Sequence, residues 1–70
     1  MGRAYANEAE TYSAGLQAAK SRDYTQALQL WFDSADNGHS ESQYRLGVMY
    51  RLGLGTKQDF KKSFLWFQLA

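Results

Sequence analysis

Residues 23–31, DYTQALQLW, return in altered form at residues 59–67, DFKKSFLWF. A shift of 36 positions, from 23 to 59, aligns Asp with Asp at the first position, a small residue with a small one at the fifth and aromatic rings at the ninth. A fixed period of this length is typical of helical repeats, in which each unit buries its apolar face against the next. We therefore expect a helix-turn-helix hairpin that occurs twice.

The whole chain divides into segments of helical length. Pro is absent, so Gly and short polar clusters separate the segments. Tyr24, Leu28 and Trp31 recur at a spacing of three to four residues and so share one helix face, and Asp23 and Asp59 are expected N-caps. The four expected helices run from about Glu8 to Ser21, from Tyr24 to about Asn37, from about Ser40 to Leu52 and from Asp59 through Ala70.

These segments predict an all-α fold, an α-α superhelix of two antiparallel helix hairpins without a sheet. We treat residues 1–70 as one repeat domain, with the first hairpin at 8–38 and the second at 39–70. Small residues are expected where helix backbones approach closely, and large aromatic residues where the core between hairpins must be filled. The small residues are Gly15, Ala27, Gly47 and Ser63, and the aromatic ones are Trp31, Trp66 and Phe67.

The composition argues for a packed domain without a cofactor. Hydrophobic residues make up 44% of the chain and aromatic residues 16%, which is typical of a chain that forms a core. The net charge is +1 and the basic residues are scattered, so neither nucleic acid nor an anionic membrane is indicated. No apolar run approaches the roughly 18 residues of a membrane helix. With no Cys and one His, we expect neither a metal site nor a cofactor.

The residues from Gly38 onward resemble the Sel-one-like repeat, a relative of the tetratricopeptide repeat. The matching residues are Leu46-Gly47, Tyr50, Gly53-x-Gly55, Asp59, Trp66-Phe67 and Ala70, and the departures are Ser42, Thr56 and Ser63, all of them small. The stretch from Glu8 to Ala35 is similar to the plain tetratricopeptide unit, with a turn about four residues shorter. The resemblance implies a tetratricopeptide-like solenoid, and it suggests a repeat protein of bacterial type.

The same resemblance implies a protein-interaction scaffold with no reaction of its own. In such repeats the first helix of each pair lines the concave face and binds a peptide or a partner helix. The residues expected there are Tyr12, Leu16, Lys20, Tyr44, Val48 and Arg51. Two alternatives stay open. In the first, four of these residues do not bind a partner and only pack between the hairpins: Tyr12, Leu16, Tyr44 and Val48. In the second, the chain is the structural end of a longer solenoid and has no ligand of its own.

Catalytic and ligand-binding motifs are weak in this sequence. His39 lies between Gly38 and Ser40 and is expected to be an exposed loop residue. The segment 53–57, GLGTK, is Gly-rich and basic, but it lacks the Walker spacing and follows a helix, so it is interpreted as the repeat turn. Lys61 and Lys62 are interpreted as a solvated helix face. A regulatory domain attached to an enzyme is a remote third possibility.

Two further expectations concern the ends of the chain. The fourth helix has no stop signal, so the second hairpin is interpreted as truncated. Its aromatic residues, Phe60, Phe64, Trp66 and Phe67, are spread over more than one face, and we expect self-association through them. Ala4-Tyr5-Ala6 is similar to the small-x-small end of a secretory signal, which suggests an exported or periplasmic protein, and otherwise a cytoplasmic one.

Overall fold

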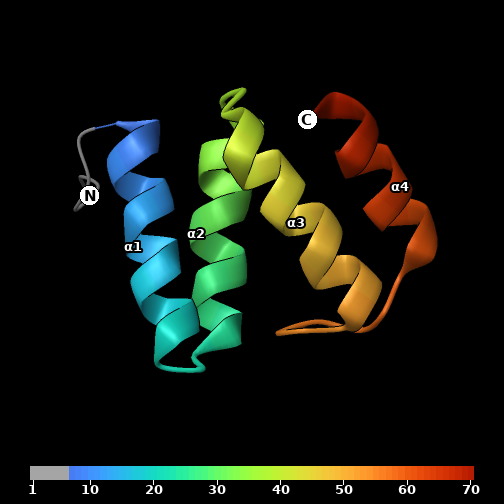
Figure 1. Ribbon diagram of the computed structural model, residues 1–70, viewed down its shortest axis with the longest axis horizontal. Coiled ribbons are helices and arrows are strands. Elements are labelled where there is room, and N and C mark those ends of the chain that lie inside the picture. Colours follow the sequence, from blue (N-terminus) through green and yellow to red (C-terminus); the bar gives the residue numbers. More distant parts are fainter. Residues whose placement is uncertain (1–6) are drawn as a thin grey trace.

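A computed structural model describes residues 7–70 and contains four α-helices, with no strand in that range. They are α1 (Glu8–Lys20), α2 (Tyr24–Asp36), α3 (Ser40–Leu52) and α4 (Phe60–Leu69), arranged in a row with each packed on the next (Figure 1). The α1–α2 and α3–α4 turns lie at the same end of the molecule (Figure 1). The predicted all-α fold is confirmed. The Ala4-Tyr5-Ala6 signal-like stretch lies outside the described residues.

Each helix begins at a side chain that accepts a hydrogen bond from the backbone N–H three residues later. The four N-caps are Asn7, Asp23, His39 and Asp59, with donor-acceptor distances of 2.9, 3.2, 3.2 and 3.0 Å. Such caps satisfy backbone donors that have no partner within the helix. The two Asp caps were predicted. His39 lies outside the helices, as expected, but it is half-buried instead of exposed and caps α3 through Nδ1.

An aromatic ring from the second helix of each hairpin lies on a glycine of the first. A Cβ atom at Gly15 would stand 2.6 Å from Cδ1 of Trp31, and one at Gly47 would stand 2.5 Å from the Phe67 ring, both too close for any real contact. The Trp31 indole also donates from Nε1 to the carbonyl of Tyr12 at 3.1 Å. The two glycines therefore receive rings, whereas the sequence led us to expect them to bring backbones together.

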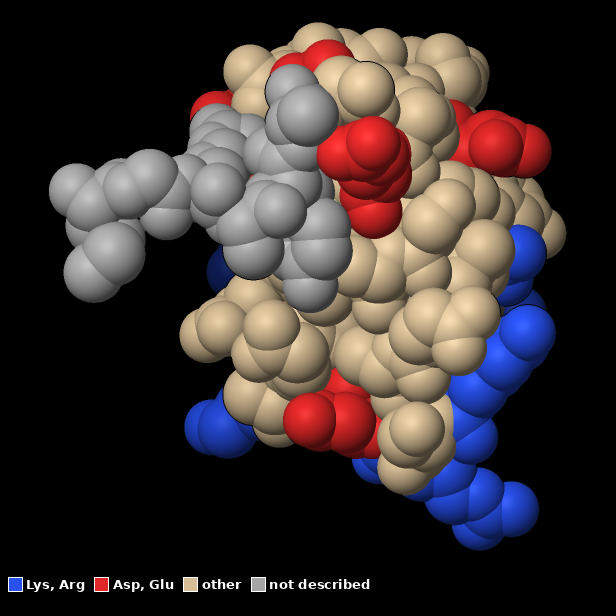
Figure 2. All heavy atoms as spheres, turned by 90° about the vertical axis from the view of Figure 1, so that its left-hand side faces the viewer, with Lys and Arg blue, Asp and Glu red and all other residues tan. Residues whose placement is uncertain are grey.

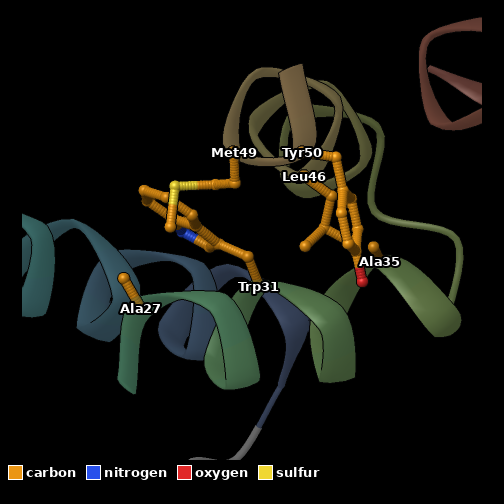
Figure 3. Packing of buried hydrophobic residues seen from close by; sticks show 6 residues of the cluster. All are labelled: Ala27, Trp31, Ala35, Leu46, Met49 and Tyr50. Carbon is orange, nitrogen blue, oxygen red and sulfur yellow. The ribbon is translucent and has the colours of Figure 1, made fainter. Parts of the chain in front are cut away.

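The apolar core lies between the two hairpins. It consists of Ala27, Trp31 and Ala35 from α2 and of Leu46, Met49 and Tyr50 from α3, all buried. In Figure 3 the Met49 side chain points toward the Trp31 indole within this cluster. A polarizable sulfur packs favourably beside an aromatic ring. Because half of these residues come from each hairpin, the core exists only when α2 and α3 are packed together.

A chain of buried hydroxyl groups joins three helices beside this core. The Ser42 hydroxyl of α3 donates to the Ser34 hydroxyl of α2 at 2.9 Å, and Ser34 donates to the carbonyl of Glu8 in α1 at 3.0 Å. Nδ1 of His39 lies 3.0 Å from the same Ser42 hydroxyl. Directional bonds of this kind fix how the helices sit relative to one another, which apolar packing alone leaves open.

The longer α3–α4 turn reaches back to the first hairpin. Gly53 and Gly55 both have φ of +72°, the left-handed conformation predicted for this turn. Gly55 lies directly against the carbonyl group of Tyr24, and a Cβ there would be 2.6 Å from the Tyr24 carbonyl carbon. The Asp59 N–H then donates to the carbonyl of Tyr50 at 2.8 Å. The turn therefore closes the second hairpin and covers the start of α2.

We predict that Gly15→Ala destabilises the protein, even though Ala favours helix by about 1 kcal/mol. The added methyl group meets the Trp31 ring, and such overpacking costs about 1–3 kcal/mol. Urea unfolding followed by circular dichroism measures the change. Gln17→Ala, on the exposed side of the same helix, is the control and should change stability by less than about 0.5 kcal/mol. A more stable Gly15→Ala protein would contradict the ring-on-glycine contact.

We also predict that Ser34→Ala lowers the free energy of unfolding by about 1–2 kcal/mol. The substitution removes the bond to the Glu8 carbonyl and one acceptor of the Ser42 hydroxyl, both in a buried environment. Thermal unfolding compares this variant with Ser13→Ala, which alters an exposed hydroxyl on α1. Equal melting temperatures for the two variants would show that the hydroxyl chain does not stabilise the fold.

Candidate protein-binding surface

The six residues predicted for the concave face divide into two groups by exposure. Lys20, Tyr44 and Arg51 are exposed, whereas Tyr12, Leu16 and Val48 are half-buried. Leu16 and Val48 occupy the same place in their hairpins, because α1 aligns with α3 at a shift of 32 positions, from Tyr12 to Tyr44. The shift between α2 and α4 is 36 positions, four more, because the turn within the second hairpin is four residues longer than the turn within the first.

Tyr12 belongs to the contact between the hairpins. Its ring centroid lies 6.2 Å from that of Trp31 and 5.1 Å from that of His39. Its hydroxyl accepts a hydrogen bond from Nε of Arg45 at 3.3 Å, and the same guanidinium lies over the Trp31 ring at 5.7 Å. Tyr12 therefore packs between the helices, which is the alternative that the sequence left open for it.

Tyr44 is the counterpart of Tyr12 in the second hairpin, but its surroundings differ. Its ring centroid is 5.6 Å from that of Phe67, and the residue is 53% exposed. On the first hairpin, Arg45 of α3 and the N-cap residue His39 cover the equivalent tyrosine. No described helix does so for Tyr44.

The four aromatic residues predicted for self-association also have different surroundings. Phe60 and Phe64 are 64% and 62% exposed. Trp66 is half-buried and meets the Phe32 ring edge-on, with centroids 5.9 Å apart, and Phe67 is half-buried on Gly47. Only Phe60 and Phe64 are therefore open to a partner without a rearrangement of the helices.

Some exposed apolar residues were not singled out from the sequence. They are Phe32, Leu52, Leu65 and Leu69. Leu65 and Leu69 stand four residues apart, so helical spacing could have indicated a second apolar stripe on α4. Their equivalents in α2 are Gln29 and Asp33, which shows that this stripe does not belong to the repeat pattern.

On the side of the molecule that α1 occupies, most acidic side chains lie apart from most basic ones. Figure 2 shows most acidic groups in the upper half and most basic groups at the lower right. Acidic residues in the first turn of α1 and Lys20 in its last turn follow the helix dipole. Lys62, expected on a solvated face, is exposed and places its ammonium group 5.4 Å from the centroid of the Tyr50 ring.

Residues 7–70 contain no enclosed pocket and no group of three His, Cys, Asp or Glu side chains placed to hold a metal ion. Within the same residues, no helix is both long and apolar enough to cross a membrane. A partner of residues 7–70 would therefore bind to exposed helix surface and not in a pocket.

Comparison with known proteins gives matches over nearly the whole chain. The model of the Sel1 repeat matches residues 3–39 and 40–70, so it includes the first hairpin, which by sequence is similar to the plain tetratricopeptide unit. The rat protein "DAP3-binding cell death enhancer 1" is 38% identical over 51 residues, which cover 73% of this chain and 10% of the rat protein. The mouse protein of that name is 38% identical over 49 residues, 70% of this chain and 10% of its own length.

The chain thus spans about a tenth of the length of these curated relatives. Both are mammalian, so they lend no support to the bacterial type that the resemblance suggests. No solved structure matches the chain.

We predict that the two equivalent tyrosines differ in their contribution to stability. Tyr12→Ala should lower the free energy of unfolding by about 2 kcal/mol or more, because it leaves a gap beside Trp31 and removes the partner of Arg45. Tyr44→Ala should cost less than about 1 kcal/mol, since its ring is largely exposed. Urea unfolding of both variants measures the difference, and equal losses would contradict the assignment of Tyr12 to the hairpin contact.

Proposed function

Because this chain belongs to the Sel1 repeat family, whose repeats generally mediate protein–protein interaction, we propose that it is a non-catalytic module that binds a protein partner. The observation that carries the proposal is the match of this family to both hairpins. The proposed partner is a protein or a peptide, and not a nucleic acid or a membrane. The relatives support this class of ligand, since their name states that they bind the protein DAP3.

The proposed binding surface follows the first helices of the two hairpins, α1 and α3. It comprises Tyr12, Leu16, Lys20, Tyr44, Val48 and Arg51, in which Leu16 and Val48 supply apolar contacts at equivalent places. Tyr12 contributes only the part of its ring that α3 leaves uncovered. A peptide or helix that lies across α1 and α3 would contact these residues together.

The charges of this surface indicate what kind of peptide it would prefer. Lys20 and Arg51 stand in the last turns of α1 and α3, which end on the same side of the molecule (Figure 1). Both are exposed. A partner with apolar side chains followed by one or two carboxylates would match Leu16 and Val48 with its apolar part and the two cations with its acidic part.

A second candidate function is that of a structural end of a solenoid. The side of α1 that corresponds to the buried side of α3 carries Ala14 and Gln17 in place of Leu46 and Met49. A polar outer helix of this kind is typical of the terminal unit of a repeat array. In that case the chain would contact only its neighbouring repeats and would select no peptide.

A peptide display library selected on the immobilised chain tests both candidates. We expect selected peptides to be acidic, and we expect the double charge reversal Lys20→Glu with Arg51→Glu to weaken their binding at least about tenfold, as measured by fluorescence anisotropy. The matched control is Lys57→Glu with Lys61→Glu, two exposed cations that are not among the six residues of the proposed surface. Purified DAP3 serves as a second probe.

Two outcomes would contradict the proposal. If the control reversal weakens binding as much as the test reversal, the partner binds elsewhere or through net charge alone. If no peptide is enriched and DAP3 does not bind, the structural-end candidate is favoured.

A further inference from the structure

The junction between the two hairpins, residues 36–40, contains the pair Asn37-Gly38. In an Asn-Gly pair the second residue has no Cβ atom to shield its backbone nitrogen, so that nitrogen can approach the Asn side-chain amide closely. We propose that Asn37 is a site of spontaneous deamidation, and that the products loosen the packing of α3 on α2.

The reaction is a cyclisation followed by hydrolysis. The backbone nitrogen of Gly38 gives its proton to hydroxide and forms a bond to Cγ of Asn37, while the bond from Cγ to Nδ2 breaks and the amide group takes a proton from water and leaves as ammonia. The cyclic succinimide then takes up water. Opening at Cγ gives Asp. Opening at the backbone carbonyl gives isoAsp, in which the main chain runs through the former side chain and is longer by a methylene group.

Both reacting groups are open to solvent. Asn37 and Gly38 are exposed, and Gly38 has φ of +90° at the end of α2. A Cβ atom placed on Gly38 would have no other atom within 4 Å. Water and hydroxide therefore reach the junction without passing through the core.

Hydrogen bonds hold the same groups in place while the junction is closed. Nδ2 of Asn37 donates to the carbonyl of Asp33 at 3.0 Å, and the N–H of Gly38 donates to the carbonyl of Ala35 at 2.9 Å. The attack requires the Gly38 nitrogen and the Asn37 amide to leave these acceptors. Deamidation therefore starts from a locally opened junction, and its rate follows the free energy of that opening.

Both products weaken the end of α2. A carboxylate cannot donate a hydrogen bond, so the bond from residue 37 to the Asp33 carbonyl is lost. The last turn of α2 already carries Asp33 and Asp36 and has no basic residue. A further negative charge at this end is unfavourable, because the C-terminal end of a helix is the negative end of its dipole.

The isoAsp product also changes how α3 is placed. In the closed junction the N–H groups of Asn37 and His39 both donate to the carbonyl of Ser34, at 3.1 and 3.2 Å. A longer main chain between residues 37 and 38 moves His39 relative to that carbonyl. His39 caps α3, and its ring lies 5.1 Å from that of Tyr12 between centroids. The displacement is therefore passed to α3, on whose packing against α2 the core depends.

The test is incubation of the whole chain at mildly alkaline pH, followed by peptide mapping with mass spectrometry that separates Asn, Asp and isoAsp. We expect both products at residue 37. Asn7 is the internal control, because it caps α1 and precedes Glu8, and it should stay intact. The free peptide of residues 33–41, DSADNGHSE, should react at least about tenfold faster than the folded chain, since it needs no opening.

A substitution at Ser34 tests whether the reaction follows the opening of the junction. Ser34→Ala removes the bonds from its hydroxyl to Glu8 and Ser42 and should speed deamidation of the folded chain about fivefold or more. Ser13→Ala, the matched control, should leave the rate unchanged. Urea below the unfolding transition should also speed the reaction of the unsubstituted chain, which gives a second measurement that needs no variant.

The aged chain itself shows the effect on packing. Ion exchange separates the unmodified chain from the products, and Asn37→Asp supplies a reference for the Asp form. We expect the isoAsp form to melt at a lower temperature than Asn37→Asp, and Asn37→Asp at a lower temperature than the unmodified chain.

Three results would overturn the inference. They are an intact Asn37 in the folded chain when the peptide has reacted completely; a rate that neither Ser34→Ala nor urea changes; and an isoAsp form that melts together with the unmodified chain. No partner is present in any of these measurements, so the inference and the proposed binding function can fail separately.

Discussion

The contact between the Trp31 indole and Gly15 is the constraint on which the other contacts depend. A glycine at this position lets the ring lie on the surface of α1, and the bond from the indole N–H to the Tyr12 carbonyl fixes its orientation. Met49 points toward the same ring in Figure 3, the Tyr12 ring lies 6.2 Å away between centroids, and the Arg45 guanidinium lies over the ring. One side chain thereby connects α1, α2 and α3. Phe67 on Gly47 repeats the first half of this arrangement without the indole bond.

The two hairpins are held in register by polar as well as apolar groups. Leu46 and Met49 are buried in the apolar core between the hairpins, but apolar contacts are non-directional and do not by themselves fix how helices are placed. The bonds from Ser42 to Ser34 and from Ser34 to Glu8 are directional, and they link α1, α2 and α3 in the observed arrangement. The small residues at these positions therefore supply hydroxyl groups to the contact as well as fitting the limited space.

Periodicity and capping chemistry sufficed to predict the four helices, the left-handed glycines of the second turn and the burial of Trp31. These features are local, because they depend on residues within one or two turns of helix. The cap formed by His39 was missed, since histidine is uncommon in that role, and so was the role of Tyr12. Whether Tyr12 lines a groove or lies between hairpins depends on α3, which begins 28 residues later. Exposure differs for equivalent residues such as Tyr24 and Phe60, so a repeat pattern alone cannot assign a binding surface.

The position of the core between α2 and α3 determines how the protein loses its structure. Neither hairpin has a buried cluster of its own, so separating the hairpins exposes Trp31 and Leu46 at once. Unfolding is therefore cooperative across the whole domain, without a stable half-folded hairpin. We expect the backbone amides of α2 and α3, which carry the core, to be the best protected from exchange with solvent, and the outer turns of α1 and α4 to be the least protected.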